Sequence, residues 1–323
     1  MIATATISVI VPVRDTLYLR QSVDSLLAGS DHIDTILVYA DGEVPGFASI
    51  EAEYQANDKV RFIRGDVQMG PSVALNICME QVTSDYTMFF SHDDFVTADF
   101  FDIRCELLQH GYDAITTVPV LVSHTGEAKR FEGSSFGSLK NGKPSEELVQ
   151  QLFQKLNFLC MPGTIVRTTV LREFGQFSPA LLGLQDYEFW LWAFIHDKKI
   201  LQLRDQAVCY RFHEKNLSQQ YTQRIDREYG HAIWSCLQRC SDENISRAFP
   251  EAAIWFSSAT LSKDVIIALI MASHPKAPVA HFGMERLLES LNCQEQLARF
   301  EHASGMTIVD IHRGLAGFSL SHI

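Results

Sequence analysis

Two adjacent acids stand behind a histidine in Ser91-His92-Asp93-Asp94, directly after the apolar run that ends at Phe90. Carboxylate oxygens suit hard divalent cations such as Mg²⁺ or Mn²⁺, and such a cation can bind the phosphates of a ligand. The same residues could form an ordinary polar turn in which Asp93 and Asp94 cap the next helix, because aspartate is favoured at helix N-termini. Taken alone, the stretch leaves both interpretations open.

The elements around this stretch predict an α/β fold. Residues 7–13 form a continuous β-branched run, which is typical of a strand buried in a parallel sheet, and further strands are predicted at residues 34–40, 60–64 and 86–90. Helical patterns alternate with them, at residues 17–27, 48–55 and 71–82. This alternation predicts right-handed βαβ units, and therefore a mostly parallel sheet flanked by helices.

Polar turns follow the predicted strands. They are Arg14-Asp15, Asp41-Gly42, Gly65-Asp66 and Ser91–Asp94, each at the carboxyl end of a strand. Ligands of open α/β sheets bind beyond those ends. A dinucleotide-binding Rossmann fold would need a glycine-rich turn after the first strand, whereas this chain has Pro12-Val13-Arg14-Asp15 there. The sequence therefore predicts a ligand site at this edge, but not a dinucleotide site.

The composition is that of a globular protein without a basic surface. The 323 residues carry a net charge of −12, and 46% are hydrophobic. This charge argues against nucleic acid as a partner, so a phosphate-bearing ligand would need a metal ion, backbone amides or a few basic side chains. No apolar run reaches the roughly 20 residues of a transmembrane segment. We expect a cytoplasmic protein, or one peripheral at the inner face of the membrane.

The pattern changes along the chain. Residues 114–122 look like a single strand. Residues 132–144 are rich in Gly, Ser and Lys, which predicts a mobile loop or lid. From about residue 221 onward, apolar residues recur at helical spacing. We therefore predict two domains, residues 1–220 and a helical C-terminal region at 221–323.

Six stretches in the first two thirds of the chain carry a family resemblance. They are ISVIVPVRD (7–15), ILVYADG (36–42), MGPSVALNICMEQVTSDYTMFFSHDD (69–94), MPGTIVR (161–167), LLGLQDYEFWLWA (181–193) and YRFHEKNLS (210–218). Each stretch is a weak signal alone. Together, in this order and spacing, they resemble a family 2 glycosyltransferase of the GT-A fold, which is Rossmann-like. The last hundred residues match no pattern that we can name.

The resemblance implies that Ser91–Asp94 stands in place of the family's Asp-x-Asp motif, which binds a divalent cation and the donor diphosphate. Asp93 is then the expected ligand of Mg²⁺ or Mn²⁺, and Asp94 a second or alternative ligand. His213 matches a family histidine that can reach the metal or the diphosphate, although a lone histidine is more often structural. Arg211 is expected to assist it, and His92 to contact the nucleotide sugar.

Further contacts with the nucleotide sugar are implied at the other strand ends. The resemblance assigns them to Pro12, Arg14, Asp15, Asp41, Gly70 and Asn76. Asp41 would accept hydrogen bonds from the base or ribose, although an Asp-Gly turn that needs no ligand stays the alternative. Gly70 would allow a close backbone approach before the following helix.

Asp186 is the general base that the resemblance implies. Apolar residues at i, i+3, i+4 and i+7 from Tyr187 to Phe194 predict a helix that begins near it. An acid there could equally be an N-terminal cap, which contributes ~0.5–2 kcal/mol. The helix dipole is expected to lower the pKa of Asp186, which would keep it ionised but make it a weaker base.

The implied function is that of an inverting glycosyltransferase. Asp186 would deprotonate an acceptor hydroxyl, which displaces the diphosphate of a nucleotide-sugar donor in one step. We expect a UDP-sugar donor and a glycan or lipid-linked acceptor, in bacterial surface-polysaccharide or lipopolysaccharide assembly. The C-terminal helices could pack on the catalytic domain, form a homo-oligomer or bind a partner enzyme.

Three positions depart from the family pattern. Ser91, Leu75 and Gln185 stand where the family often has a charged residue. These departures keep open a non-catalytic nucleotide-sugar-binding or scaffold module of the same fold. A sugar-1-phosphate nucleotidyltransferase, which has a related fold, is disfavoured because its glycine-rich signature after the first strand is missing.

Overall fold

The computed structural model describes residues 6–129, 136–214, 216, 222–258 and 261–313. The chain divides into two compact units. The first comprises residues 1–141, 158–185 and 198–220, and the second comprises 142–157, 186–197 and 221–323. Two segments of the predicted first domain thus belong to the second unit, and the division into domains at residue 220 stays a prediction.

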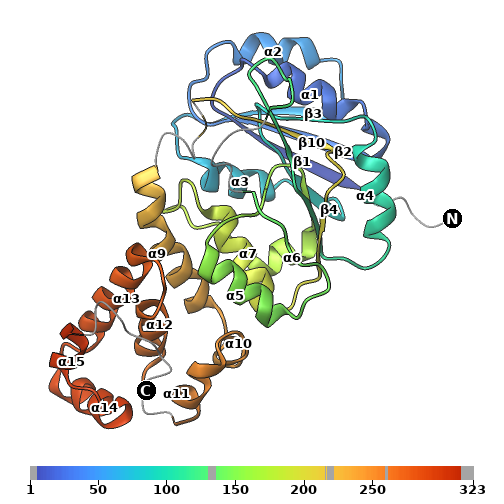
Figure 1. Cartoon of the computed structure of the whole chain (residues 1–323). Coiled ribbons are helices and arrows are strands. Elements are labelled where there is room, and N and C mark those ends of the chain that lie inside the picture. Colours follow the sequence, from blue (N-terminus) through green and yellow to red (C-terminus); the bar gives the residue numbers. More distant parts are fainter. Residues whose placement is uncertain (1–5, 130–135, 215, 217–221, 259–260, 314–323) are drawn as a thin grey trace. The chain divides into compact units, whose positions relative to one another are not determined.

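The first unit is built on a seven-stranded sheet in the order β3-β2-β1-β4-β8-β6-β9 (Figure 1). Its strands are β1 (Ile7–Val13), β2 (Ile33–Ala40), β3 (Val60–Arg64), β4 (Tyr86–Phe89), β6 (Ala114–Thr117), β8 (Thr164–Arg167) and β9 (Ile200–Leu203). β1 pairs in parallel with β2 and β4, and β2 with β3. β6 and β9 are also parallel, whereas β8 runs antiparallel to both of its neighbours. The predicted α/β fold with a mostly parallel sheet is confirmed.

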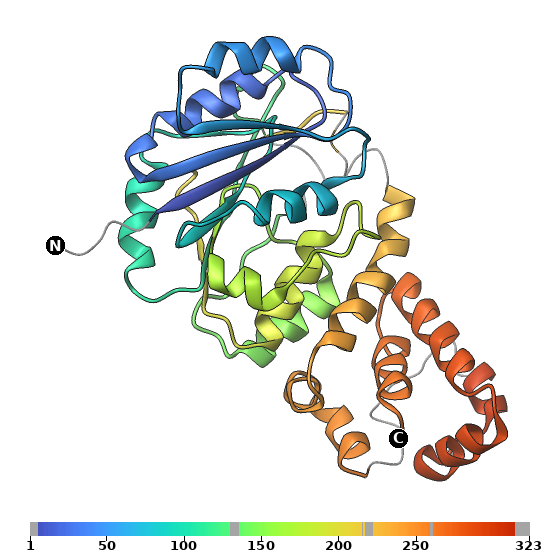
Figure 2. The same ribbon diagram turned by 180° about the vertical axis from the view of Figure 1, so that it is seen from behind.

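Helices cover both faces of this sheet. They are α1 (Leu19–Leu27), the 3-10 turn η1 (Ser30–His32), α2 (Phe47–Tyr54), α3 (Pro71–Met79), α4 (Phe100–Leu108) and α6 (Thr168–Phe174). Ile7, Val9 and Val11 of β1 share one buried cluster with apolar side chains of α1, α2 and α4. The residues between them point to the opposite face. Figures 1 and 2 show α1 and α2 on one side of the sheet and α3 on the other.

A second, three-stranded sheet joins distant segments of the first unit. Its order is β5 (Phe95–Val96), β10 (Val208–Arg211) and β7 (Val120–Val122). Cys209 pairs with Phe95 in an antiparallel register. The residues after β10 are thereby brought beside the residues before β5, which are Ser91–Asp94.

The single strand predicted over residues 114–122 is wrong. The segment forms β6 and β7, which belong to different sheets. Pro119 lies between them. Proline has no N–H to donate to a sheet ladder, so it ends β6 and lets the chain pass to the smaller sheet.

The predicted lid at 132–144 lies partly outside the described residues. Its described part is attached to β9, because the Leu139 N–H donates to Gln202 Oε1 at 2.7 Å. Asn141 Nδ2 also donates to the carbonyl oxygen of Gln202, at 2.9 Å. Residues 139–141 are therefore anchored to the main sheet.

The second unit is helical, as predicted for the C-terminal region. Its elements are α5 (Ser145–Lys155), α7 (Gln185–Ile195), α9 (Thr222–Arg239), α10 (Asp242–Ala248), the 3-10 turn η2 (Pro250–Ala252), α11 (Ala253–Ser258), α12 (Lys263–Ala272), α13 (Ala277–Ser290), α14 (Gln294–Ser304) and α15 (Ile308–Arg313). Residues 187–195 of α7 are all buried. Edge-on contacts of Tyr187 with Tyr229 and of Phe153 with Phe249, each with ring centroids 5.0 Å apart, join the earlier segments to the later helices. Among the described helices, none is long and apolar enough to cross a membrane.

Candidate active site

The turn Ser91–Asp94 connects β4 to the short strand β5. The next helix, α4, begins at Phe100, and its N-cap residue is Asp99. Asp93 and Asp94 therefore do not cap a helix, which excludes the alternative that aspartate propensity suggested. Both side chains are buried, with exposed fractions of 7% for Asp93 and 1% for Asp94. A buried pair of acids needs specific partners to hold its charge.

Asp93 has such partners on both carboxylate oxygens. Ser91 Oγ donates to Oδ1, and His213 Nε2 lies 3.0 Å from Oδ2. Burial alone would raise the pKa of Asp93, but the hydrogen bond from His213, the charge of His92 and the hydrogen bond from Ser91 outweigh it and lower the pKa. Asp93 is therefore ionised at neutral pH. Its carboxylate is paired with the imidazole of His213, which lies 120 residues further along the chain.

Asp94 is buried behind this pair. Its Oδ1 accepts the Arg211 backbone N–H at 2.8 Å. Its Oδ2 is buried and has no hydrogen-bond partner among the described residues. Burial first, and then the neighbouring charge of Asp93, raises the pKa of Asp94 well above its ordinary range. An unpaired buried carboxyl oxygen is costly, and it is the kind of group that a bound cation or a water molecule satisfies.

Arg211 is a buried arginine that holds the turn, and its guanidinium donates to protein acceptors. Nε donates to the carbonyl oxygen of Asp93 at 2.8 Å. Nη1 donates to the carbonyl oxygens of Ser123 and His124, at 3.0 and 2.8 Å, and Nη2 donates to Gln21 Oε1 at 2.6 Å. Forked hydrogen bonding of this kind suits arginine and not lysine. The predicted contact of Arg211 with the nucleotide sugar stays a prediction, since these atoms already position Asp93.

The sequence did not indicate Tyr18 as part of this site. Its ring lies 4.0 Å from the Arg211 guanidinium carbon, and its centroid is 5.9 Å from that of the His213 ring. An aromatic residue in the loop between the first strand and helix, at the edge where ligands bind, was the available signal. Tyr18 closes one side of the Asp93–His213 pair.

Residues at the end of β1 are linked to this turn and to the loop before α3. His92 Nδ1 lies 3.2 Å from the carbonyl oxygen of Pro12. With the side-chain amide of Gln68 turned so that its oxygen faces Arg14, this oxygen accepts from both Nε and Nη2 of Arg14, at 3.0 Å each. Asp15 Oδ1 accepts the N–H of Leu17 at 3.1 Å, so this acid stabilises its own turn.

Asp41 fastens the loop before α3 to the end of β2. Its Oδ1 accepts the N–H of Met69 at 2.7 Å, and its Oδ2 accepts the N–H of Gly70 at 3.0 Å. Gly70 has φ +91°, and a Cβ there would lie 2.5 Å from Leu182 Cδ2. Leu182 thus lies close to Gly70, and the predicted contact of Gly70 with the nucleotide sugar stays a prediction. A base or ribose contact at Asp41 stays a prediction, with the carboxylate oriented by two backbone amides.

Asn76 on α3 is used inside the protein. Its Nδ2 donates to the carbonyl oxygen of Phe177 and its Oδ1 accepts the N–H of Phe177, both at 2.9 Å. The neighbouring Leu75 is buried. These contacts fix the loop after α6 to α3, and a ligand contact at Asn76 stays a prediction.

The predicted residues of the first unit gather at one edge because β2, β1 and β4 are adjacent in the sheet. Asp41 follows β2, Arg14 follows β1, and Asp93 follows β4. The carboxyl ends of parallel neighbours lie along the same edge. The structure thus brings together side chains that the sequence spreads over residues 12–94, with Arg211 and His213 added through β10.

Asp186 belongs to the second unit and lies in the first turn of α7. Its Oδ2 accepts from Asn157 Nδ2 at 2.9 Å, and its Oδ1 accepts the N–H of Tyr187 at 2.7 Å. The expectation that the helix dipole lowers the pKa of Asp186 is wrong, because burial dominates and raises the pKa to about 6. A carboxylate with this pKa is better matched to proton transfer near neutral pH.

Gln185 precedes this acid at a position where the family often has a charge. Its side-chain oxygen is buried and has no hydrogen-bond partner among the described residues. A buried acceptor of this kind needs a donor from solvent or ligand. Gln185 can therefore accept from a hydroxyl group but cannot supply a negative charge.

The side chains fit a cation that is shared with a diphosphate. Within the described residues, no group of three or more His, Cys, Asp or Glu side chains is arranged to hold a metal ion. Mg²⁺ is commonly bound through one or two carboxylates, with phosphate oxygens and waters as the remaining ligands. Asp93 Oδ2 and His213 Nε2 would be two such ligand atoms, and the unpartnered oxygen of Asp94 lies in the same turn.

The chain belongs to glycosyl transferase family 2, whose model matches residues 8–175. An uncharacterised glycosyltransferase of Rickettsia felis is 24% identical over 245 residues, which cover 71% of this chain and 37% of that protein. The chain thus spans little more than a third of that relative's length.

Solved structures with the same fold include S. aureus TarS and a mannosyltransferase. Residues 1–349 of S. aureus TarS in complex with UDP align with a TM-score of 0.56 and 16% identity over 93% of this chain and 92% of that one. A mannosyltransferase of Pyrobaculum calidifontis, in complex with GDP-Man and Mn²⁺, aligns with a TM-score of 0.52 and 10% identity over 96% and 81%. The likeness supports the predicted GT-A fold.

Proposed function

We propose that this protein is a metal-dependent glycosyltransferase that moves a sugar from a nucleoside diphosphate donor to an acceptor hydroxyl with inversion at the anomeric carbon. The observation that carries the proposal is the buried, ionised Asp93 paired with His213 at 3.0 Å at the ligand-binding edge of a family 2 fold. TarS has been solved with UDP-GlcNAc and the mannosyltransferase with GDP-Man and Mn²⁺, which supports a nucleotide-sugar donor here.

Asp93 and His213 are the residues that would hold Mg²⁺ or Mn²⁺, with Asp94 behind them. When bound, the cation supplies positive charge to the diphosphate leaving group. The chain's own contribution is to fix the ligand atoms, through Ser91 on one oxygen of Asp93 and Arg211 on its carbonyl. Fixed ligands need little reorganisation during the reaction, which is how preorganised electrostatic stabilisation works.

Asp186 is the proposed general base. Its carboxylate would accept the proton of the acceptor hydroxyl while the hydroxyl oxygen bonds to the anomeric carbon and the bond from that carbon to the diphosphate oxygen breaks. One displacement at one carbon inverts its configuration. A pKa of about 6 leaves the group mostly ionised at neutral pH and still basic enough to take a proton.

The remaining parts of the proposal concern the substrates and the setting. The donor would be a UDP-sugar, and the acceptor a glycan or lipid-linked glycan of bacterial surface-glycan assembly in the cytoplasm or at the inner face of the membrane. Asp41, Arg14 and the other residues at the strand ends would contact the nucleotide. Ser91, which offers a hydroxyl where the family has an acid, keeps a non-catalytic binding module as the second candidate.

The test is calorimetric titration of UDP and GDP into the full chain with and without Mn²⁺. Wild-type protein should bind at least one nucleotide more tightly with Mn²⁺, and Asp93→Asn should lose at least tenfold of this Mn²⁺-dependent affinity. Asp85→Asn is the matched control, since Asp85 is an exposed acid at the opposite end of the same strand, bonded to Thr6. Equal Mn²⁺-dependent affinity in wild type and Asp93→Asn would contradict the assignment of Asp93.

A further inference from the structure

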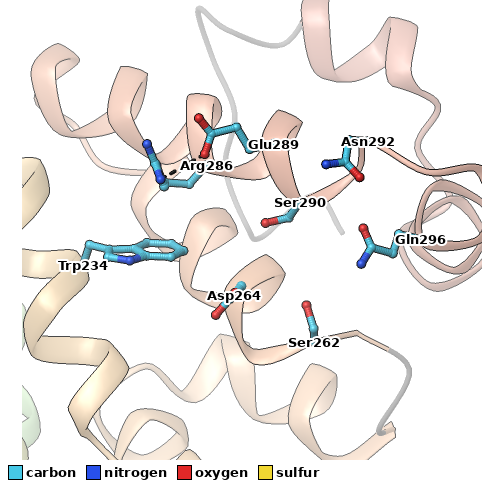
Figure 3. Close-up of a pocket in the computed structure, with 8 residues that line it drawn as sticks. All are labelled: Trp234, Ser262, Asp264, Arg286, Glu289, Ser290, Asn292 and Gln296. Carbon is cyan, nitrogen blue, oxygen red and sulfur yellow. Dashed lines mark ion pairs between the residues drawn. The ribbon is translucent and has the colours of Figure 1, made fainter.

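The second unit contains a hollow of about 280 Å³ that the proposed reaction does not use. It opens between α9, α12, α13 and α14 (Figure 3). Its principal lining residues are Trp234, Asp264, Arg286, Glu289, Asn292 and Gln296. The lining combines one aromatic ring with polar side chains that form hydrogen bonds.

Trp234 gives the hollow a fixed aromatic wall. Its ring is half-buried and packs against the apolar cluster of the second unit. It also meets Phe282 edge-on, with ring centroids 6.4 Å apart. Figure 3 shows the indole extending toward the other lining side chains. An indole held in place in this way can cover the apolar face of a ligand with little further loss of side-chain freedom.

The opposite side of the hollow offers neutral hydrogen-bonding groups. Asn292 and Gln296 are exposed, and each amide has both a donor and an acceptor. Asp264 and Glu289 add acceptors, and Gln238 Nε2 orients Asp264 by donating to its Oδ1 at 2.7 Å. Mixed donors and acceptors facing an aromatic ring match a ligand that has hydroxyl groups at its edge and C–H groups on its face.

The charges of the lining argue against an anion. Two carboxylates stand against one guanidinium, and Arg286 Nη1 is already paired with Glu289 at 2.9 Å. The net negative charge of the lining would repel a phosphate, whereas it would not repel a neutral hydroxyl group.

We propose that this hollow binds a neutral saccharide unit, a hexose or N-acetylhexosamine, of the acceptor glycan. The sugar ring stacks on Trp234, and its hydroxyl groups bond to Asn292 and Gln296. Its place as an acceptor subsite rests on the proposed function, whereas the binding of a saccharide does not. The second unit thereby contributes to the choice of acceptor.

The test uses the full chain and simple saccharides as probes: methyl β-glucoside, methyl β-galactoside, N-acetylglucosamine and the corresponding β-1,4-linked disaccharides. Saturation-transfer NMR and tryptophan fluorescence should show binding of at least one probe, with Kd on the order of 1 mM. The double variant Asn292→Ala/Gln296→Ala should weaken that binding at least tenfold. Gln294→Ala removes an exposed amide from the same helix turn outside the lining and should leave it unchanged.

Trp234→Ala should abolish binding, and Trp234→Phe should retain part of it. The inference is overturned if no probe binds, if the double variant binds as wild type does, or if inorganic phosphate or tetramethylammonium competes with the saccharide for the hollow. Mn²⁺-dependent nucleotide binding, measured on the same variants, should stay unchanged. If wild-type protein binds a saccharide but no nucleotide, the proposed function is wrong and the saccharide site is still supported.

Discussion

Replacing Asp186 with asparagine should make the protein more stable and less active at the same time. Burial raises the pKa of Asp186 to about 6, from an ordinary value of 3.8. A carboxyl group whose pKa is higher in the folded than in the unfolded protein destabilises the fold when it is ionised, because folding then costs more for the charged form. The gap of about two pH units corresponds to at most about 3 kcal/mol of unfolding free energy.

The sign and the pH window follow from the same two values. Near pH 3 Asp186 is mostly protonated in both states and the penalty is small, and it grows as pH rises between about 4 and 6 and is complete above the folded-state pKa. Asp186→Asn removes the charge and nearly keeps the shape. Its unfolding free energy should exceed that of wild type by up to about 3 kcal/mol at pH 7.5, and the difference should shrink as the pH falls toward 4.

Urea unfolding followed by tryptophan fluorescence measures this difference for the relevant unit. The four tryptophans, at 190, 192, 234 and 255, all belong to the second unit, as Asp186 does. The matched control is Asp242→Asn, which removes an exposed acid from the first turn of α10. That variant should show no comparable gain in stability between pH 4 and pH 7.5.

The activity of the same variant should move in the opposite direction. Removing a general base lowers kcat/KM by about 10²–10⁴-fold. The kcat/KM of wild type should fall about tenfold for each pH unit below 6, as Asp186 becomes protonated. A helix cap, in contrast, stabilises by ~0.5–2 kcal/mol. If Asp186→Asn is less stable than wild type at pH 7.5 and retains its activity, then Asp186 is a helix cap and not a general base.

Three further predictions concern the site in the first unit. Arg211→Lys cannot reproduce the forked hydrogen bonds that hold the Asp93 turn. Tm should therefore fall in scanning fluorimetry, and Mn²⁺-dependent nucleotide affinity should drop at least tenfold in calorimetry. Unchanged affinity would show that the turn keeps its conformation without Arg211. His213→Ala should weaken Mn²⁺ binding roughly 10–100-fold, and an equal Mn²⁺ titration in both proteins would exclude His213 as a ligand. Gly70 has φ +91° and Leu182 beside it, so Gly70→Ala should lower the unfolding free energy in urea by about 1–3 kcal/mol. The loss should exceed that of Gly111→Ala, because Gly111 has φ +80° but open space around it. Equal losses would mean that Leu182 moves aside.

The strands and helices that position the site could be predicted because their patterns are local. The strands predicted at 7–13 and 60–64 are β1 and β3, with the predicted bounds. Each of these strands is flanked by polar turns, so a short buried strand was the one interpretation that remained. The prediction of one strand at 114–122 was wrong, because the chain passes into a second sheet at Pro119. The apolar pattern does not indicate which sheet a strand joins.

The contacts within the site could not be predicted in the same way. The pairing of Asp93 with His213 depends on the register of β10 with β5, and only the family resemblance suggested it. The burial of Arg211 depends on Tyr18 and on the loop at 123–124, which its own sequence neighbourhood does not indicate. The pKa of Asp186 was predicted in the wrong direction, because the helix dipole is visible in a sequence and desolvation by surrounding segments is not.

Release of nucleoside diphosphate from a donor panel is the most direct test of the proposed sugar transfer. The full chain would be incubated with Mn²⁺ and UDP-glucose, UDP-GlcNAc or GDP-mannose, and free UDP or GDP would be measured together with transfer to added saccharide acceptors. At least one donor should be turned over by wild type and by Asp85→Asn, but not by Asp93→Asn. A donor that binds with Mn²⁺ while its sugar is neither hydrolysed nor transferred to any acceptor would contradict the claim and identify a non-catalytic nucleotide-sugar-binding module.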